Sequence, residues 1–321
     1  MKRMNRILCI ALCVCLLCGL TIPVSANGSA DNVLVTNSLN PVEGDDIVAS
    51  KNVETGEVTY SQFSSESQAY SRTAASMGEI AEGWFPDVEN FNESNDSTQG
   101  NNQRNVLGDD DRIKVTNTEV LPYSAICYIE IDWPDGSTSV GTAWMIYSDV
   151  AVTAGHCVYS TKHGGWAQKI KLWPGKDGYG LWNNPYGTTE VSNMHASANW
   201  TSSANQNFDW AVLELEDNIG NQTGWFGFGW SVNSLTGTTV TISGYPSEYR
   251  YYQYKMTDEI TNCTTNKLYY NVIDTSGGQS GSPIYTSNNI SYGIHCYGGE
   301  TENSGTRITE WLFDYLSSFR D

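Results

Sequence analysis

The sequence from Val106 to Asp321 is a series of short apolar runs separated by glycine, asparagine, proline and serine. Many short strands at this spacing are typical of a sandwich or barrel. The C-terminal end differs, because apolar residues recur on one helical face between Thr309 and Phe319. We therefore expect an all-β fold that ends in a helix. The predicted strands are Ala125–Ile131, Thr142–Tyr147, Val150–Thr153, Lys169–Trp173, Trp210–Leu215, Thr238–Ser243, Leu268–Val272 and Ser291–His295.

The composition agrees with this fold class. The chain of 321 residues contains 30 glycines, 19 tyrosines and 11 tryptophans, and only 17% of its residues are charged. Aromatic residues favour strands, and no heptad or Gly-X-Y repeat is present. Acidic residues outnumber basic residues by 36 to 17, which gives a net charge of −19 at pH 7. A nucleic-acid partner is not expected, because phosphate binding needs a basic surface.

The first 26 residues have the pattern of a secretory signal peptide. A basic start is followed by 14 apolar residues from Ile7 to Leu20, fewer than the roughly 20 needed to span a bilayer. The small residues of Val24-Ser25-Ala26 predict a cut after Ala26. We therefore expect a secreted, extracellular protein with no membrane attachment once the signal is removed.

The next segment, residues 27–105, is rich in serine, asparagine and glutamate and has no cysteine. It carries 13 acidic and 3 basic residues, and its last part, from Glu89 to Asn105, is polar without any apolar period. Such a tract is typical of an exposed linker that proteases cut. The segment is either a disordered spacer or a removable pro-segment, and the motifs described next favour a pro-segment.

Three segments carry residues that can act together in catalysis. One presents His156 at the end of a predicted strand, and another places Asp209 at the start of a strand. The third places Ser280 in the glycine-rich turn Ser276–Pro283. Each alone is a common structural feature. Together they supply what serine attack on a carbonyl requires, namely a base that takes the hydroxyl proton and a carboxylate that orients the base. Their order along the chain is the chymotrypsin order.

These segments resemble those of the bacterial glutamyl endopeptidases, which are secreted chymotrypsin-like serine proteases. The resemblance implies a chymotrypsin-like double six-stranded β-barrel for residues 106–321, with the active site between the barrels. It also implies protein or peptide substrates and an activating protease that cuts between Asn105 and Val106. We expect a monomer. The similarity runs from about Val106 to Arg320 and is carried by Val106–Arg112, the histidine segment, Phe208-Asp209, Ser243–Pro246, Ser276–Pro283 and Gly293–His295.

The resemblance assigns a role to each catalytic residue. Ser280 is expected to be the nucleophile, and His156 the base that takes its proton and later gives it to the leaving amine. Asp209 is expected to fix the tautomer of the histidine. The backbone amides of Gly278 and Ser280 are expected to form the oxyanion hole, and glycine suits a position with close backbone approach.

The same resemblance suggests the substrate. Digestive relatives commonly carry aspartate before the nucleophile, where it pairs with the new N-terminus, but this chain has Gln279 there. The α-amino group of Val106 must therefore make a different contact. In the glutamyl endopeptidase pattern it helps to bind the substrate carboxylate, and the matching pocket residues are Thr275 and His295. Because a partly desolvated carboxylate needs positive charge and donors, we expect cleavage after Glu, with Asp a poorer fit.

Other interpretations are open at this stage. In one alternative, His295 is an ordinary strand histidine and the protease has a different specificity. In another alternative, the chain is a catalytically inactive binding or adhesion homologue that kept the barrel. The presence of all three catalytic residues together with Gly278 argues against an inactive homologue.

Four cysteines lie outside the signal peptide, at positions 127, 157, 263 and 296. Secretion and an even number favour disulfides, with three possible pairings. We favour Cys127–Cys157 and Cys263–Cys296, because each pair stays within one barrel. No metal or cofactor is expected, because no group of cysteines and histidines has the spacing of zinc ligands.

Overall fold

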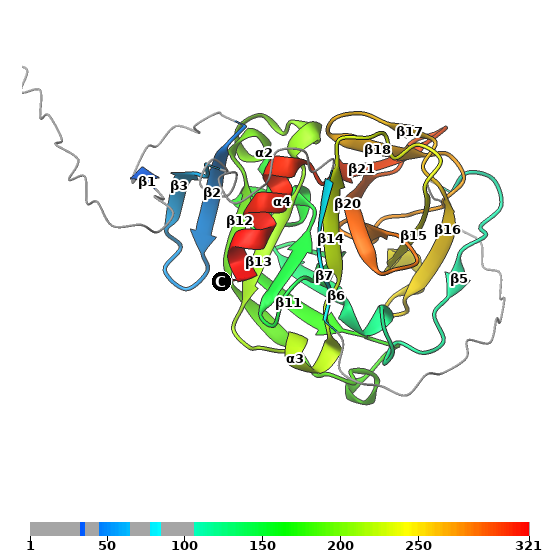
Figure 1. The fold of residues 1–321 in the computed structure, drawn as a ribbon. Coiled ribbons are helices and arrows are strands. Elements are labelled where there is room, and N and C mark those ends of the chain that lie inside the picture. Colours follow the sequence, from blue (N-terminus) through cyan, green and yellow to red (C-terminus); the bar gives the residue numbers. More distant parts are fainter. Residues whose placement is uncertain (1–32, 36–44, 65–77, 85–105, 321) are drawn as a thin grey trace, which may run out of the picture. The chain divides into compact units, whose positions relative to one another are not determined.

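The computed structural model describes residues 33–35, 45–64, 78–84 and 106–320, and the structural statements below concern these residues (Figure 1). The predicted signal peptide, residues 1–26, and the polar tract from Glu89 to Asn105 lie outside them. Among the helices of the described residues, none is long and apolar enough to cross a membrane.

The first sheet contains a closed six-stranded barrel. Its strands follow the order β12, β11, β6, β7, β8 and β13, and β13 pairs again with β12 to close the ring. A register shift between Val191 and Asn193 interrupts the β12–β13 ladder, as bulges often do where barrel strands bend. The bounds are β6 Ile126–Asp132, β7 Thr138–Met145, β8 Val150–Thr153, β11 Lys169–Pro174, β12 Thr189–Ser197 and β13 Ala211–Leu215.

The second sheet has the order β17, β18, β21, β20, β19, β15, β16 and β5, and β14 pairs with both β20 and β4. The β14–β20 pair is parallel, whereas β14–β4 and β19–β20 are antiparallel. Most of this sheet is the yellow-to-red part of the chain in Figure 1. The bounds are β4 Gly78–Ala81, β5 Ile113–Lys114, β14 Gly227–Ser231, β15 Thr239–Gly244, β16 Tyr254–Glu259, β17 Asn262–Cys263, β18 Lys267–Tyr270, β19 Pro283–Tyr285, β20 Ile290–Tyr297 and β21 Asn303–Arg307.

Helix α4 (Glu310–Ser317) is the predicted C-terminal helix. It begins where the hydroxyl of Thr309 accepts a hydrogen bond from the amide of Leu312 at 3.2 Å, as a capping residue does. Other regular elements are short: α2 Ala198–Ser203, α3 Gly220–Thr223, the ribbon β9 Tyr159–Ser160 with β10 Gly165–Trp166, and 3-10 turns at Tyr123–Ala125, Gly155–Cys157, Thr161–His163, Leu181–Asn183, Gln206–Phe208, Ser247–Tyr249 and Ser318–Arg320.

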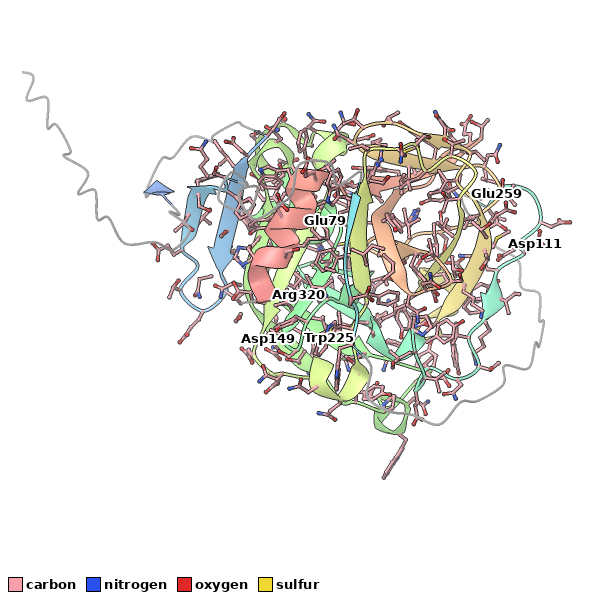
Figure 2. All side chains as sticks on the ribbon, in the orientation of Figure 1. Glu79, Asp111, Asp149, Trp225, Glu259 and Arg320 are labelled. Carbon is pink, nitrogen blue, oxygen red and sulfur yellow. The ribbon has the colours of Figure 1, made fainter. Side chains whose placement is uncertain are left out.

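The predicted all-β fold, with two barrel-like sheets and a terminal helix, is confirmed. Each of the eight predicted apolar runs contains a strand, with ends that shift by a few residues. One large apolar cluster joins the first barrel to α4, and a smaller cluster around Ile242, Leu268 and Ile284 fills the second sheet. Figure 2 shows side chains filling the interior of both sheets.

Strands that precede residue 85 extend both sheets. β2 (Ile47–Asn52) pairs antiparallel with β12, and β3 (Val58–Gln62) and β1 (Val33–Val35) continue that sheet outward. β4 pairs with β14 in the second sheet. The ring of Phe63 meets the rings of Trp311 and Tyr315 on α4 edge to face. Where it is described, this part of the chain therefore forms strands that pair with both sheets.

Candidate active site

His156 is placed by a short turn at the end of β8. The strand ends at Thr153, and the 3-10 turn Gly155–Cys157 follows directly. The backbone amide of His156 donates to Asp209 Oδ1 at 2.8 Å, and its Nδ1 lies 2.8 Å from Asp209 Oδ2. A Cβ atom at Gly155 would lie 3.0 Å from both Asp209 Oδ1 and the Trp200 ring. The small residue before the histidine therefore allows the carboxylate to approach the turn.

Asp209 lies just before β13, and its side chain is fully buried. Its carboxylate accepts from the amide and ring of His156, and Oδ2 also accepts from the hydroxyl of Tyr297. A buried carboxylate is tolerated when donors surround it in this way. The carboxylate oxygens thereby hold the imidazole in one orientation.

The electrostatic environment makes His156 a stronger base. Burial alone would lower the pKa of its imidazole, but the negative charge of Asp209 and the hydrogen bond to it outweigh burial. The pKa of His156 is therefore raised well above its ordinary value. A base with a raised pKa holds a captured proton more firmly.

Ser280 lies beside the middle of β7 and the end of β8, and β8 is the strand that leads into His156. The amide of Thr142 donates to the Ser280 carbonyl at 2.9 Å. The next residue, Gly281, has φ +92°, and a Cβ there would lie 2.0 Å from the Thr142 carbonyl oxygen and 2.2 Å from Thr153 Oγ1. Only glycine fits so close an approach. No hydrogen bond joins the hydroxyl of Ser280 to His156 among the described residues, and such bonds often tighten only when substrate binds.

The turn before Ser280 leaves two amides unoccupied. Gly278 has φ +94°, and a Cβ there would lie 2.5 Å from the Tyr245 carbonyl oxygen, so this position also needs glycine. The Gly278 carbonyl accepts from the hydroxyl of Thr142 at 2.9 Å. Within the described part of the chain, neither the amide of Gly278 nor that of Ser280 donates to an acceptor. Two free neighbouring amides are the donors that an oxyanion hole requires.

The predicted pocket residues are buried near this turn. Thr275 is 1% exposed, and its hydroxyl has no hydrogen-bond partner in the described structure. His295 is 2% exposed, and the hydroxyl of Tyr270 hydrogen-bonds its Nδ1. Burial lowers the pKa of His295 to about 3, with a further contribution from the charge of His156. His295 is therefore neutral near pH 7, so the positive charge expected on it is absent from the free protein.

The segment that begins at Val106 contacts the residue before Thr275. The amide of Leu107, which follows Val106, donates to the carboxylate of Asp274 at 2.7 Å, and Asp274 is the neighbour of Thr275. In this continuous chain Val106 has no α-ammonium group, because residue 105 precedes it.

The predicted disulfides are not formed, because all four described cysteines are free thiols. Cys263 lies on β17 and Cys296 on β20, and β18 and β21 lie between these strands. At about 4.8 Å per strand their Cα atoms are about 14 Å apart, beyond the roughly 7 Å that a disulfide allows. The pairing Cys263–Cys296 is therefore wrong for this fold.

The pairing Cys127–Cys157 is also absent, and the thiols have other contacts. Cys157 Sγ lies 3.8 Å from the Ser280 carbonyl oxygen, and Cys296 Sγ lies 3.2 Å from that of Asp209. Cys127 is fully buried on β6, where burial raises the pKa of its thiol. These cysteines pack as small buried groups.

Two residues that support the site were missed from the sequence. Tyr297 holds Asp209, and Tyr270 holds His295. Both lie in strands, where the sequence pattern indicates only a packing role for a tyrosine. The sequence gives one indication of a role for Tyr297, because it lies two residues after His295, next to the segment Gly293–His295 that carries the family resemblance.

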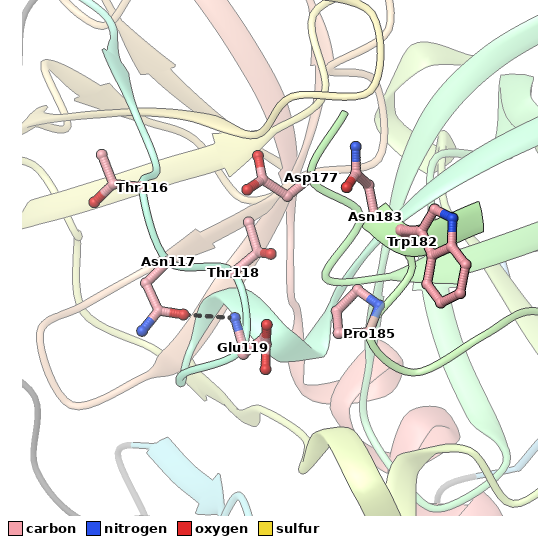
Figure 3. A pocket seen from close by; sticks show the side chains of 8 residues that line it. All are labelled: Thr116, Asn117, Thr118, Glu119, Asp177, Trp182, Asn183 and Pro185. Atoms are coloured by element: carbon pink, nitrogen blue, oxygen red, sulfur yellow. Dashed lines mark hydrogen bonds between the residues drawn. The ribbon is translucent and has the colours of Figure 1, made fainter. Parts of the chain in front are cut away.

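A polar hollow of about 260 Å³ lies elsewhere (Figure 3). On its wall the amide of Glu119 donates to Asn117 Oδ1 at 3.0 Å, and Trp182 is 99% exposed. None of the candidate catalytic or pocket residues lines it. Its lining residues are Thr116, Asn117, Thr118, Glu119, Asp177, Trp182, Asn183 and Pro185.

Comparison with known proteins identifies the family. Residues 114–312 match the trypsin family model. The chain is 39% identical over 232 residues to a glutamyl endopeptidase of Bacillus licheniformis, covering 68% of this chain and 70% of the relative. The chain belongs to the glutamyl endopeptidase family of trypsin-like proteins. As a member of this family it is a serine endopeptidase that acts on proteins or peptides, and the resemblance noted in the sequence is confirmed.

Other proteins are also similar to this chain. A solved structure described as a Glu endopeptidase in complex with MPD superposes with a TM-score of 0.60 at 32% identity, covering 67% of this chain and 98% of the other. A Bacillus subtilis protein named extracellular metalloprotease is 34% identical over 218 residues, covering 66% of this chain and 68% of that protein. In the described residues of this member of the glutamyl endopeptidase family, no three His, Cys, Asp or Glu side chains lie together as metal ligands.

Proposed function

We propose that this chain is a secreted endopeptidase, made as a precursor, that hydrolyses peptide bonds after glutamate and less readily after aspartate. The observation that carries the proposal is the double contact of His156 with Asp209, beside a serine turn with two free amides. This arrangement supports a triad of His156, Asp209 and Ser280. The pattern of the first 26 residues supports secretion, and the family supports a precursor cut before Val106 and a monomeric enzyme.

In the proposed reaction, Ser280 Oγ attacks the carbonyl carbon of the scissile bond while His156 Nε2 takes the hydroxyl proton. The electron pair of the C=O bond moves onto oxygen, and the amides of Gly278 and Ser280 donate to that oxygen. When the tetrahedral intermediate collapses, the C–N bond breaks and the amine takes the proton from His156. Water then attacks the acyl group in the same way and frees Ser280. Asp209 holds the imidazole throughout.

The preference for an acidic residue rests on the buried pocket residues. A buried hydroxyl without a partner is costly, so the hydroxyl of Thr275 is available to a ligand oxygen. A substrate carboxylate beside His295 favours the protonated imidazole and raises its pKa. Once the chain is cut, Val106 adds an α-ammonium close to Thr275. The charge that balances the substrate is therefore created by processing and by binding.

The proposed function is tested with a panel of peptides and the form that begins at Val106. We expect the fastest cleavage after Glu, slower cleavage after Asp, and much slower cleavage after Lys, Arg or Phe. Fastest cleavage after Lys, Arg or Phe would replace this specificity with a different one. Hydrolysis of none of the peptides, together with no labelling of Ser280 by a fluorophosphonate, would favour an inactive binding homologue.

The strand pairing predicts that the pro-segment stays bound after the cut. Cleavage between Asn105 and Val106 breaks one peptide bond but leaves the β2–β12 and β4–β14 pairs in place. The aromatic contacts of Phe63 with α4 also persist. We expect the two fragments to co-elute in gel filtration at neutral pH and to appear as a one-to-one complex in native mass spectrometry.

A charge at a buried position of β2 should release the cut pro-segment from the rest of the protein. Val48 is 0% exposed, so Val48→Asp buries an unpaired carboxylate, and we expect the cut fragments of this variant to separate. Thr55→Asp places the same charge in the exposed turn after β2 and should leave the complex intact. Immediate separation of the wild-type fragments would show that these strands do not hold the pro-segment.

A further inference from the structure

The segment that follows the proposed cut is bound along the loop before the nucleophile. The amides of Leu107 and Asp111 both donate to the carboxylate of Asp274, at 2.7 and 3.1 Å. The side chain of Asp111 is exposed and points away from the sheet (Figure 2). The side chain of Arg112, which follows, has 0% of its surface exposed. The segment thus brings one buried cation to the loop 274–280.

The guanidinium of Arg112 uses its donors in several directions. Nη1 donates to Gln279 Oε1 at 2.6 Å and to Ser276 Oγ at 2.9 Å. Nε donates to Asp110 Oδ1 at 2.9 Å, and Nη2 donates to Glu248 Oε1 at 2.6 Å. A buried guanidinium is stable only when its charge is balanced and its N–H groups are occupied in this way.

The counter-charges keep this group ionised. Burial would raise the pKa of Asp110, but the hydrogen bonds and charge of Arg112 lower it below its ordinary value. Burial likewise opposes the charge on Arg112, yet Asp110 and Glu248 raise the pKa of the guanidinium overall. Asp110 and Arg112 therefore both keep their charges across the neutral pH range.

Gln279 links this network to the catalytic turn. Its Oε1 accepts from Arg112 and also from the backbone amide of Ser276 at 3.0 Å. Its backbone amide donates to the Ser276 carbonyl at 3.1 Å, so one residue closes the turn twice. Gln279 lies between Gly278 and Ser280, whose free amides face no acceptor in the described structure. A change in the position of Gln279 must therefore move both amides.

We propose that Arg112 is the positioning residue of the oxyanion turn, acting through Gln279 and Ser276 on the amides of Gly278 and Ser280. The proposal rests on the proposed triad, and it adds a residue that touches neither substrate nor nucleophile. Arg112 makes these contacts in the chain that still carries residue 105, so they do not require the cut before Val106. The guanidinium of Arg112 thus positions the turn before processing. The cut before Val106 then adds only the α-ammonium group of the substrate pocket.

The test compares kcat and KM for a Glu peptide in the processed wild type and in Arg112→Gln. Removing one oxyanion donor typically lowers kcat by about 100-fold or more, so a displaced turn should lower kcat by about 100-fold with KM within about threefold. Arg112→Lys keeps the charge but not the planar fork, and we expect it to recover part of the lost kcat. Circular dichroism and thermal melting establish that each variant is folded.

Arg307 provides the matched control. It is also a buried arginine, and it donates to the carbonyls of Thr264, Ser231 and Asn233, away from the catalytic turn. Arg307→Gln should lower the melting temperature without lowering kcat of the folded enzyme. An equal loss of kcat in Arg307→Gln and Arg112→Gln would show that Arg112 acts only through stability and would overturn the proposal.

A second variant, at Gln279, tests the proposal if Arg112→Gln does not fold. Gln279→Met removes Oε1 with little change of shape, and we expect the same loss of kcat at unchanged KM. Where both single variants fold, the double variant should be no worse than either, because both break one linkage. Wild-type kcat in Gln279→Met would overturn the proposal. A wild-type enzyme that neither cleaves peptides nor labels at Ser280 would instead overturn the proposed function.

Discussion

Replacing Asp209 by asparagine is expected to lower kcat by about 10,000-fold while leaving the fold intact. The buried carboxylate accepts from the amide and ring of His156 and from the hydroxyl of Tyr297. An amide group carries only one acceptor oxygen. Its NH₂ group would face a donor, and the imidazole would turn or change tautomer so that Nε2 no longer accepts the serine proton. Steady-state hydrolysis of a Glu peptide measures the loss.

The pH profile separates this effect from simple loss of structure. His156 must be neutral to act as the base, so activity appears as pH rises through its pKa. Asp209 raises this pKa above its ordinary value against the opposing effect of burial. The acid limb of kcat/KM should therefore lie above about pH 6.5 in the wild type and move to lower pH in Asp209→Asn.

Tyr297→Phe is the control for this variant. It removes one donor to Asp209 but keeps the ring and both contacts with His156. Because a single hydrogen bond to a charged group is worth about 1.5–3 kcal/mol, we expect a loss of roughly 10- to 100-fold, far smaller than for Asp209→Asn. An Asp209→Asn enzyme within tenfold of wild-type kcat, with an unmoved acid limb, would show that another group orients the histidine.

Replacing His295 by leucine is expected to lower kcat/KM for Glu peptides by about 1,000-fold, because a polar group of the substrate then enters the pocket without its partner. Cleavage of a peptide with a small neutral residue at the same position should change by less than about tenfold, since it makes no such contact. Thr275→Val keeps the shape of the side chain and should lower the rate on Glu peptides by about 30-fold.

The control for the pocket is His163→Gln. His163 lies in a turn, hydrogen-bonds Asp135 at 2.9 Å and stacks on Trp133, and it touches none of the pocket residues. This variant should keep the wild-type preference. A His295→Leu enzyme that still cuts fastest after Glu would locate the specificity elsewhere.

The fold could be predicted well because its signals are local. The eight apolar runs and the amphipathic C-terminal segment each determine their own element, and all of them became the expected strands or helix. Several strands were not predicted, among them β12, β14, β16, β19 and β21 of the two sheets. The strands β2 and β4 were not predicted either, and they are stabilised by the neighbours β12 and β14 rather than by their own apolar pattern. Edge pairing between segments far apart in the chain leaves little trace in either segment.

The site could be predicted only in part for the same reason. His156 and Ser280 lie in turns whose glycines are closely approached by other parts of the chain, so the local sequence carries the signal. Arg112, Tyr270 and Tyr297 contact residues far from them in the chain, and their immediate neighbours do not reveal these distant partners. The disulfides were predicted from secretion and an even number of cysteines, and their pairing from the barrel in which each cysteine lies. Neither argument fixes the strand order that separates Cys263 from Cys296.

The most direct test of the account is covalent labelling of the processed enzyme with a fluorophosphonate, followed by peptide mapping. The reagent requires an activated hydroxyl, which we assign to Ser280 with His156 as its base, and an oxyanion hole, which we assign to the amides of Gly278 and Ser280. We predict one label, on Ser280, that disappears in Ser280→Ala and is strongly slowed in His156→Ala. Active enzyme that is labelled at another residue, or that still cleaves peptides as Ser280→Ala, would contradict the account.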